Sequence, residues 1–108
     1  TARATEDLVE RLLPVRDNLA RALEQGADTD IRDGVEGTLR ELDRVLEDEG
    51  VETIEPELGD DPDPERHEVM MQVESDQPAG TIAELYRPGY EMADRVIRTA
   101  QVTVSTSD

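Results

Sequence analysis

The stretch RPGYEMADRVIRTAQVTV, from Arg87 to Val104, decides how the second half of the chain folds. Pro88-Gly89 is a strong turn signal, because proline presets φ and glycine supplies positive φ. From Ala100 to Val104, small or apolar side chains alternate with polar ones. This period of two predicts a strand with one buried face and one solvated face.

Two cations, Arg95 and Arg98, lie between this turn and this strand, in a chain that has few basic residues. Clustered arginines add little to the solubility of so acidic a protein, so they raise the question of a function. Two interpretations stay open at this point. The arginines pair with nearby carboxylates such as Asp94 and Glu91, or they present guanidinium groups to a partner.

The charge of the chain is its most unusual property. Its 108 residues carry a formal net charge of −17, from 28 acidic against 11 basic residues, and every basic residue is arginine. Such self-repulsion destabilises a compact state in ordinary buffer, and molar salt screens it because the Debye length falls to about 3 Å. The acids are spread along the whole chain, which favours a protein of a high-salt cytoplasm over an acidic mimic of nucleic acid.

The composition also argues against several classes of protein. There are no cysteines, which excludes disulfides and thiolate metal sites. No apolar run approaches the roughly 20 residues that span a bilayer, and no basic stripe indicates nucleic-acid binding. The single histidine, His67, is weak support for catalysis, and it more simply caps the proline-rich loop before it or packs at a strand start. We therefore expect no enzyme, no cofactor and no metal site.

The first half of the chain predicts two amphipathic helices, over residues 6–25 and 30–49, with Thr29 or Asp30 as the second N-cap. Pro14 should kink the first helix or restart it. Apolar stripes of this length exceed what one small sheet can cover, which favours a homodimeric four-helix bundle. The residues predicted at the dimer interface are Leu8, Leu12, Val15, Leu19, Val35, Leu39, Leu42 and Leu46.

After Gly50 the period changes to that of short strands, over residues 51–55, 67–74 and 81–87 and in the C-terminal stretch. The acidic loop over residues 56–65 lacks the spacing of a calcium loop and is expected to be a solvated turn. The fold class is therefore α+β, with a helical dimerisation region at 1–50 and a small all-β wing at 51–108. The predicted wing core is Val51, Ile54, Val69, Met71, Val73, Ile82, Leu85, Val96, Ala100, Val102 and Val104.

Four separated motifs resemble the GrpE family, the nucleotide exchange factors of the DnaK chaperone. They are LLPVRDNLARAL (12–23), VEGTLRELDRVLEDEGVETI (35–54), DPERHEVMMQVES (63–75) and GYEMADRVIRTAQVTV (89–104). The resemblance implies an elongated dimer whose wing grips the nucleotide-binding domain of the chaperone, opens its cleft and lets ADP leave. It also implies that most of the family's long N-terminal helix is absent from this chain.

Carried over by position, the resemblance implies that Arg95 is the first candidate for chaperone contact. Tyr86 and the loop residues Pro62 and Pro64 match other contact positions on the wing, and Arg98 is either a further contact or structural. The main alternative is an acidic dimerisation or adaptor module without exchange activity. An enzyme with His67 as its base is a more distant alternative.

Overall fold

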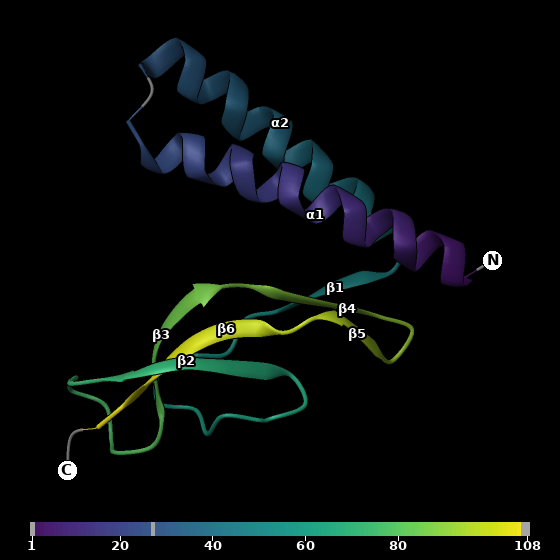
Figure 1. Ribbon diagram of the computed structural model, residues 1–108. Coiled ribbons are helices and arrows are strands. Elements are labelled where there is room, and N and C mark those ends of the chain that lie inside the picture. The colour runs from purple at the N-terminus through teal and green to yellow at the C-terminus, as the bar shows by residue number, and fades with distance from the viewer. Residues whose placement is uncertain (1, 27, 107–108) are drawn as a thin grey trace. The chain divides into compact units, whose positions relative to one another are not determined.

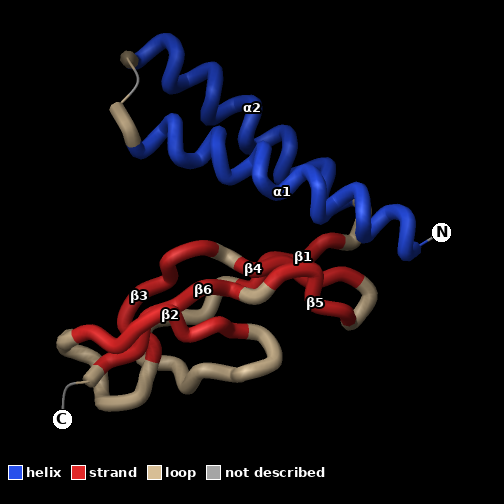
Figure 2. The backbone as a smooth tube through the Cα atoms, viewed as in Figure 1, coloured by secondary structure: helices blue, strands red, loops and turns tan. Residues whose placement is uncertain are grey.

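The computed structural model describes residues 2–26 and 28–106. Its contacts divide the chain into two compact units, Thr1–Val51 and Glu52–Asp108, which we call the helical unit and the β unit. Two helices are followed by six strands in two small sheets, so the predicted α+β class is confirmed (Figures 1 and 2).

The helical unit is a hairpin of α1 (Ala2–Glu24) and α2 (Thr29–Asp48), as Figure 1 shows. Both predicted helices are confirmed. Of the two expectations for Pro14, a kink or a restart, the restart does not occur, because one helix runs through that residue; the kink stays a prediction. A proline inside a helix removes one backbone hydrogen bond, and α1 continues on both sides of this residue. The N-cap of α2 is Asp28, one residue before the predicted caps; its carboxylate accepts a hydrogen bond from the Ile31 N–H.

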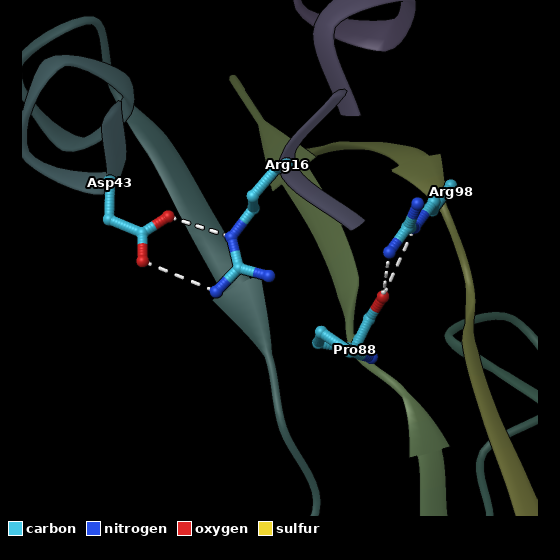
Figure 3. A network of polar contacts seen from close by, with 4 residues as sticks. All are labelled: Arg16, Asp43, Pro88 and Arg98. Atoms are coloured by element: carbon cyan, nitrogen blue, oxygen red, sulfur yellow. Dashed lines mark hydrogen bonds and ion pairs between the residues drawn. The ribbon is translucent and has the colours of Figure 1, made fainter. Parts of the chain in front are cut away.

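Two arginines tie α1 to α2. The Arg16 guanidinium donates through Nε and Nη2 to the two carboxylate oxygens of Asp43, at 2.7 and 3.2 Å (Figure 3). Near the connection, Arg32 Nη1 donates to the Leu23 carbonyl at 2.7 Å. The same carbonyl also accepts from the Gly26 N–H at 3.4 Å, so two donors reach this carbonyl at the C-terminal end of α1. The two contacts fix the antiparallel pairing of the helices.

The β unit contains two three-stranded sheets. One has the order β1-β4-β5, from β1 (Val51–Ile54), β4 (Gly89–Met92) and β5 (Arg95–Arg98). The other has the order β2-β6-β3, from β2 (His67–Val73), β6 (Ala100–Ser105) and β3 (Ile82–Arg87). In the second sheet β6 is central, parallel to β2 and antiparallel to β3.

The core of the β unit forms around β6. Ile54, Ile82, Ala100 and Val102 are buried together, and Leu85 and Val96 pack against them. The predicted solvated face of β6 is wrong, because Thr103 and Ser105 are buried as well. Their hydroxyls keep hydrogen-bond partners: Thr103 donates to a Glu84 carboxylate oxygen, and Ser105 Oγ donates to the Gln77 carbonyl. Buried hydroxyls are tolerated when they are bonded in this way.

The predicted core was wrong for two residues of β2. Val69 is 46% exposed and Met71 is 60% exposed. β2 is an edge strand, and its register on β6 shifts between these two residues. Residues 68–72 of this strand are all exposed, so neither of its faces is covered there and the alternation on which the prediction rested does not mark a core. Tyr90 and Met92, by contrast, are buried in β4 and were not predicted.

Pro88-Gly89 is not a positive-φ turn. Pro88 alone separates β3 from β4, and the chain passes there from one sheet to the other. Gly89 has no positive φ, so that expectation is wrong. The residue is glycine for a different reason: a Cβ there would lie 2.7 Å from the Arg98 carbonyl oxygen and would also collide with the Ala100 nitrogen. Close approach of two backbones is a common requirement for glycine.

We predict that Gly89→Ala destabilises the β unit by about 1–3 kcal/mol or more, because the colliding atoms belong to the backbone and cannot move aside easily. Urea unfolding followed by circular dichroism in molar salt measures the loss. A free energy of unfolding equal to that of the parent would contradict the close approach of β4 to the Arg98–Ala100 segment.

Candidate functional site

The site residues predicted from the sequence lie on three segments of the β unit. Pro62 and Pro64 lie in the loop before β2, Tyr86 lies in β3, and Arg95 begins β5. Tyr86 is 74% exposed, and Arg95 and Pro64 are also exposed, while Pro62 is partly buried. The structure therefore leaves most of these side chains accessible to a partner.

The proline-rich loop is fixed at its C-terminal end by His67. The Asp63 N–H donates to His67 Nδ1 at 2.9 Å, and the His67 N–H donates to the Asp63 carbonyl at 2.7 Å. The expectation that this histidine caps the loop is confirmed. Because Nδ1 accepts a hydrogen bond, the neutral ring holds its proton on Nε2. In this arrangement the histidine is used for loop structure.

A second contact joins the same loop to β4. Arg66 Nη2 donates to Glu91 Oε1 at 2.9 Å, and the pair is partly buried. The Arg66 carbonyl also accepts from the Ala100 N–H at 2.9 Å, which continues the loop into the sheet. Glu91 was one of the carboxylates considered for Arg95 and Arg98, and in the structure it pairs with Arg66, an arginine 25 residues away. No local sequence signal points to this pair.

Arg98 has a structural position. Its Nε and Nη2 both donate to the Pro88 carbonyl, at 3.1 and 3.0 Å (Figure 3). The same guanidinium lies over the Tyr90 ring, 5.2 Å from its centroid. Cation–π contacts of this kind favour a planar guanidinium over an ammonium group. Arg98 therefore holds the passage between β3 and β4, whereas Arg95 is the exposed cation of β5.

Arg95 follows a hairpin turn with unusual backbone geometry. Ala93 and Asp94 have φ of 53° and 62°, and they connect β4 to β5. Two positive φ values in a two-residue loop define a type I′ turn, which usually carries Asn-Gly. Alanine in this region costs roughly 1 kcal/mol or more. Ala93-Asp94 is not a recognisable turn signal of this type, so the hairpin that positions Arg95 was missed.

In the described ranges, 2–26 and 28–106, the structure shows no metal-binding group of three or more histidine or acidic side chains. Within the same ranges, neither helix combines the length and the apolar character needed to cross a bilayer. The residues predicted as the site are mostly exposed side chains on a β scaffold, an arrangement suited to binding another macromolecule.

Comparison with known proteins gives a family for the chain. The family model described as GrpE matches residues 1–106. Among curated proteins, the chain is 71% identical to Protein GrpE of Haloferax mediterranei, over 95% of this chain and 43% of the relative. It is 70% identical to Protein GrpE of Natronomonas pharaonis, over 96% and 48%. It is 44% identical to Protein GrpE of Bordetella petrii, over 93% and 55%. The chain thus spans about half the length of these relatives.

We predict that the two arginines of β5 differ in their effect on stability. Arg98→Ala should lower the free energy of unfolding by about 1–3 kcal/mol, because the Pro88 carbonyl loses its donors. Arg95→Ala, at an exposed position, should change it by no more than about 0.5 kcal/mol. Urea unfolding in molar salt compares the two. Equal losses in both variants would contradict the division between a structural and a surface arginine.

Proposed function

The chain belongs to the GrpE family, and from this premise we propose that it is a nucleotide exchange factor. It binds the nucleotide-binding domain of a DnaK-type chaperone, opens the nucleotide cleft and promotes ADP release. The observation that carries the proposal is the family match over residues 1–106, on a chain whose β unit exposes Tyr86 and Arg95. Residues 1–50 are the proposed dimerisation region, and residues 51–108 the chaperone-binding wing.

The proposed mechanism is differential binding. The wing binds the open, nucleotide-free arrangement of the chaperone more tightly than the closed ADP form, so it shifts the population toward the open form. Thermodynamic linkage requires ADP to weaken the binding of the wing by the same factor. ATP then enters, and the chaperone releases its substrate. In the proposed mechanism no covalent bond is made or broken, so the protein acts without being an enzyme. Because the proposed partner is a cytoplasmic chaperone, we also propose a cytoplasmic location.

The fixed geometry of the β unit supports this role. The Arg66–Glu91 pair and the cap at His67 hold the proline-rich loop in place before a partner arrives. A preformed surface binds without the entropic cost of ordering its loops. In molar salt long-range steering is screened, so the contact must rely on short hydrogen bonds and apolar packing. Arg95 supplies a guanidinium that suits a carboxylate on the chaperone, and Tyr86 supplies apolar area with a polar tip.

A homodimer formed by the helical unit completes the proposal. Within the chain, Val9, Leu13 and Leu46 are buried, while Leu8, Val15, Ile31 and Val45 remain about half exposed or more. The other predicted interface residues, Leu12, Leu19, Val35, Leu39 and Leu42, are partly buried. Exposed apolar side chains repeated along two helices mark an interaction surface. A second copy covers them in a four-helix bundle.

The glycines of α2 support the same interface. An open groove along this helix is lined by Asp33, Gly34, Gly37, Thr38, Glu41, Leu42 and Val45. A Cβ at Gly34 would meet no atom within 4 Å, and one at Gly37 would meet only the end of the Arg40 side chain. Packing inside one chain thus does not require either glycine, although each costs about 1 kcal/mol in a helix. In the proposed dimer, Gly34 and Gly37 allow a helix of the second copy to approach α2 closely.

We predict that the chain accelerates ADP release from a halophilic DnaK-type chaperone in molar salt, and that Arg95→Ala slows this release by about 10- to 150-fold. That range corresponds to a charged hydrogen bond of about 1.5–3 kcal/mol. A fluorescent ADP reports the rate. Arg40→Ala, the same change at an exposed position of α2, is the matched control and should keep the parent rate.

If the parent chain left ADP release unchanged while remaining folded and dimeric, the acidic adaptor alternative would replace the exchange factor. If the parent were active and Arg95→Ala equally active, exchange would stand and the assignment of Arg95 would fail.

We predict that Gly34→Ala weakens the dimer while it stabilises the helix. The added methyl removes a glycine penalty of about 1 kcal/mol but overpacks the interface by about 1–3 kcal/mol. Sedimentation equilibrium in molar salt should show a dissociation constant raised about 5- to 150-fold. Glu47→Ala, at an exposed α2 position outside the groove, is the control. If Gly34→Ala stabilised the helix and left the dissociation constant at the parent value, the groove would not be part of the dimer interface.

A further inference from the structure

The three methionines of the chain lie in two different environments. Met92 in β4 is 8% exposed, whereas Met70 and Met71 in β2 are 46% and 60% exposed. The exposed pair is consecutive, and Val69 beside it is 46% exposed. Three adjacent apolar side chains at half exposure are unusual in a chain of which 36% of residues are charged. Exposed apolar clusters of this kind mark functional surfaces.

The backbone explains why both methionines reach solvent. β2 is bonded to β6 along one edge only, and the register shift between Val69 and Met71 leaves Met70 without a partner in β6. In a regular strand, consecutive side chains point to opposite faces, and one of the pair would be covered wherever one face is buried. In β2, however, residues 68–72 are all exposed, so neither face of the strand is covered there and both thioethers are accessible.

We propose that Met70 and Met71 are an oxidation site at which a hydroperoxide reduces chaperone binding without unfolding the β unit. A lone pair of the methionine Sδ attacks one peroxide oxygen, the O–O bond breaks, and a sulfoxide forms. For hydrogen peroxide the other oxygen leaves as water, so the sulfur loses two electrons and the peroxide gains them. The product is a polar, chiral side chain in place of a flexible apolar one.

The composition of the chain directs the oxidant to these residues. There is no cysteine to react first, and thiolates are the groups that peroxides oxidise most readily. Met92 is shielded by the β unit, so it serves as an internal reference in the same molecule. Because Met70 and Met71 already lie in solvent, their sulfoxides need not enter the core, and the sheet keeps its packing.

The effect on binding rests on the proposed function. In β2, Met70 is the extra residue between the partners of Val102 and Thr103 in β6. In β3, Tyr86 is the extra residue between the partners of Val102 and Gln101. The two exposed residues thus flank β6 at the same level, about 10 Å apart from backbone to backbone for two strand spacings. A chaperone surface of ordinary size that contacts Tyr86 also reaches residues about 10 Å away, and flexible thioethers there suit an apolar partner.

The experiment treats the full chain with hydrogen peroxide in molar salt and removes the peroxide before the chaperone is added. Peptide mass spectrometry should show Met70 and Met71 oxidised well before Met92. Circular dichroism and urea unfolding should stay close to those of the untreated chain. The rate of fluorescent ADP release should fall about tenfold, the loss expected from about 1.4 kcal/mol of contact.

Two variants separate the site from other effects of peroxide. In the double variant M70L/M71L, which conserves volume, the ratio of exchange activity after and before peroxide should stay near one. In Met92→Leu the ratio should fall as it does in the parent. Oxidation of Met92 at the rate of the other two, loss of the fold on oxidation, or unchanged exchange with both sulfoxides present would each overturn the proposal. An inactive untreated chain would instead contradict the exchange function itself.

Discussion

Burial of β6 on both faces is the constraint on which the β unit depends. Ala100 and Val102 face the core, Thr103 and Ser105 are buried on the other side, and strands are bonded along both edges. The residues and backbone segments that pack next to β6 are therefore constrained by its position. Gly89 has no room for a side chain, since the backbone next to β6 passes too close. Arg98 bridges to the Pro88 carbonyl, where the chain changes sheets. The exposed side chains of the β unit are consequently attached to a backbone whose conformation is fixed by these contacts.

The local periods of the sequence predicted most of the elements. Both helices and the three strands with clear alternation could be found because side-chain direction repeats every 3.6 or every 2 residues. The position of a strand within a sheet has no such local signal. Val69 and Met71 alternate like core residues, yet they lie on an edge strand with a bulge. Pro88-Gly89 was misinterpreted because glycine serves both positive φ and close approach, and the sequence does not distinguish these uses.

The candidate site was only partly predictable for a similar reason. A family resemblance pointed to Tyr86 and Arg95, and the structure leaves both exposed. Arg95 and Arg98 look alike in the sequence, and the structure distinguishes them by the contacts of Arg98 with Pro88 and Tyr90 and by the exposure of Arg95. The Arg66–Glu91 pair joins residues 25 positions apart, so no local pattern reveals it. These contacts connect the acidic composition to function: in molar salt, short and preformed contacts are the ones that survive screening.

The central claim is that the β unit binds the nucleotide-free chaperone better than the ADP form. Amide hydrogen exchange of this chain, with and without a DnaK-type nucleotide-binding domain in molar salt, tests it most directly. The account predicts slower exchange in peptides that contain the 93–95 hairpin, Tyr86 and the 62–64 loop, and predicts that excess ADP reverses this protection. Protection confined to residues 1–50, or protection in the β unit that ADP leaves unchanged, would contradict it.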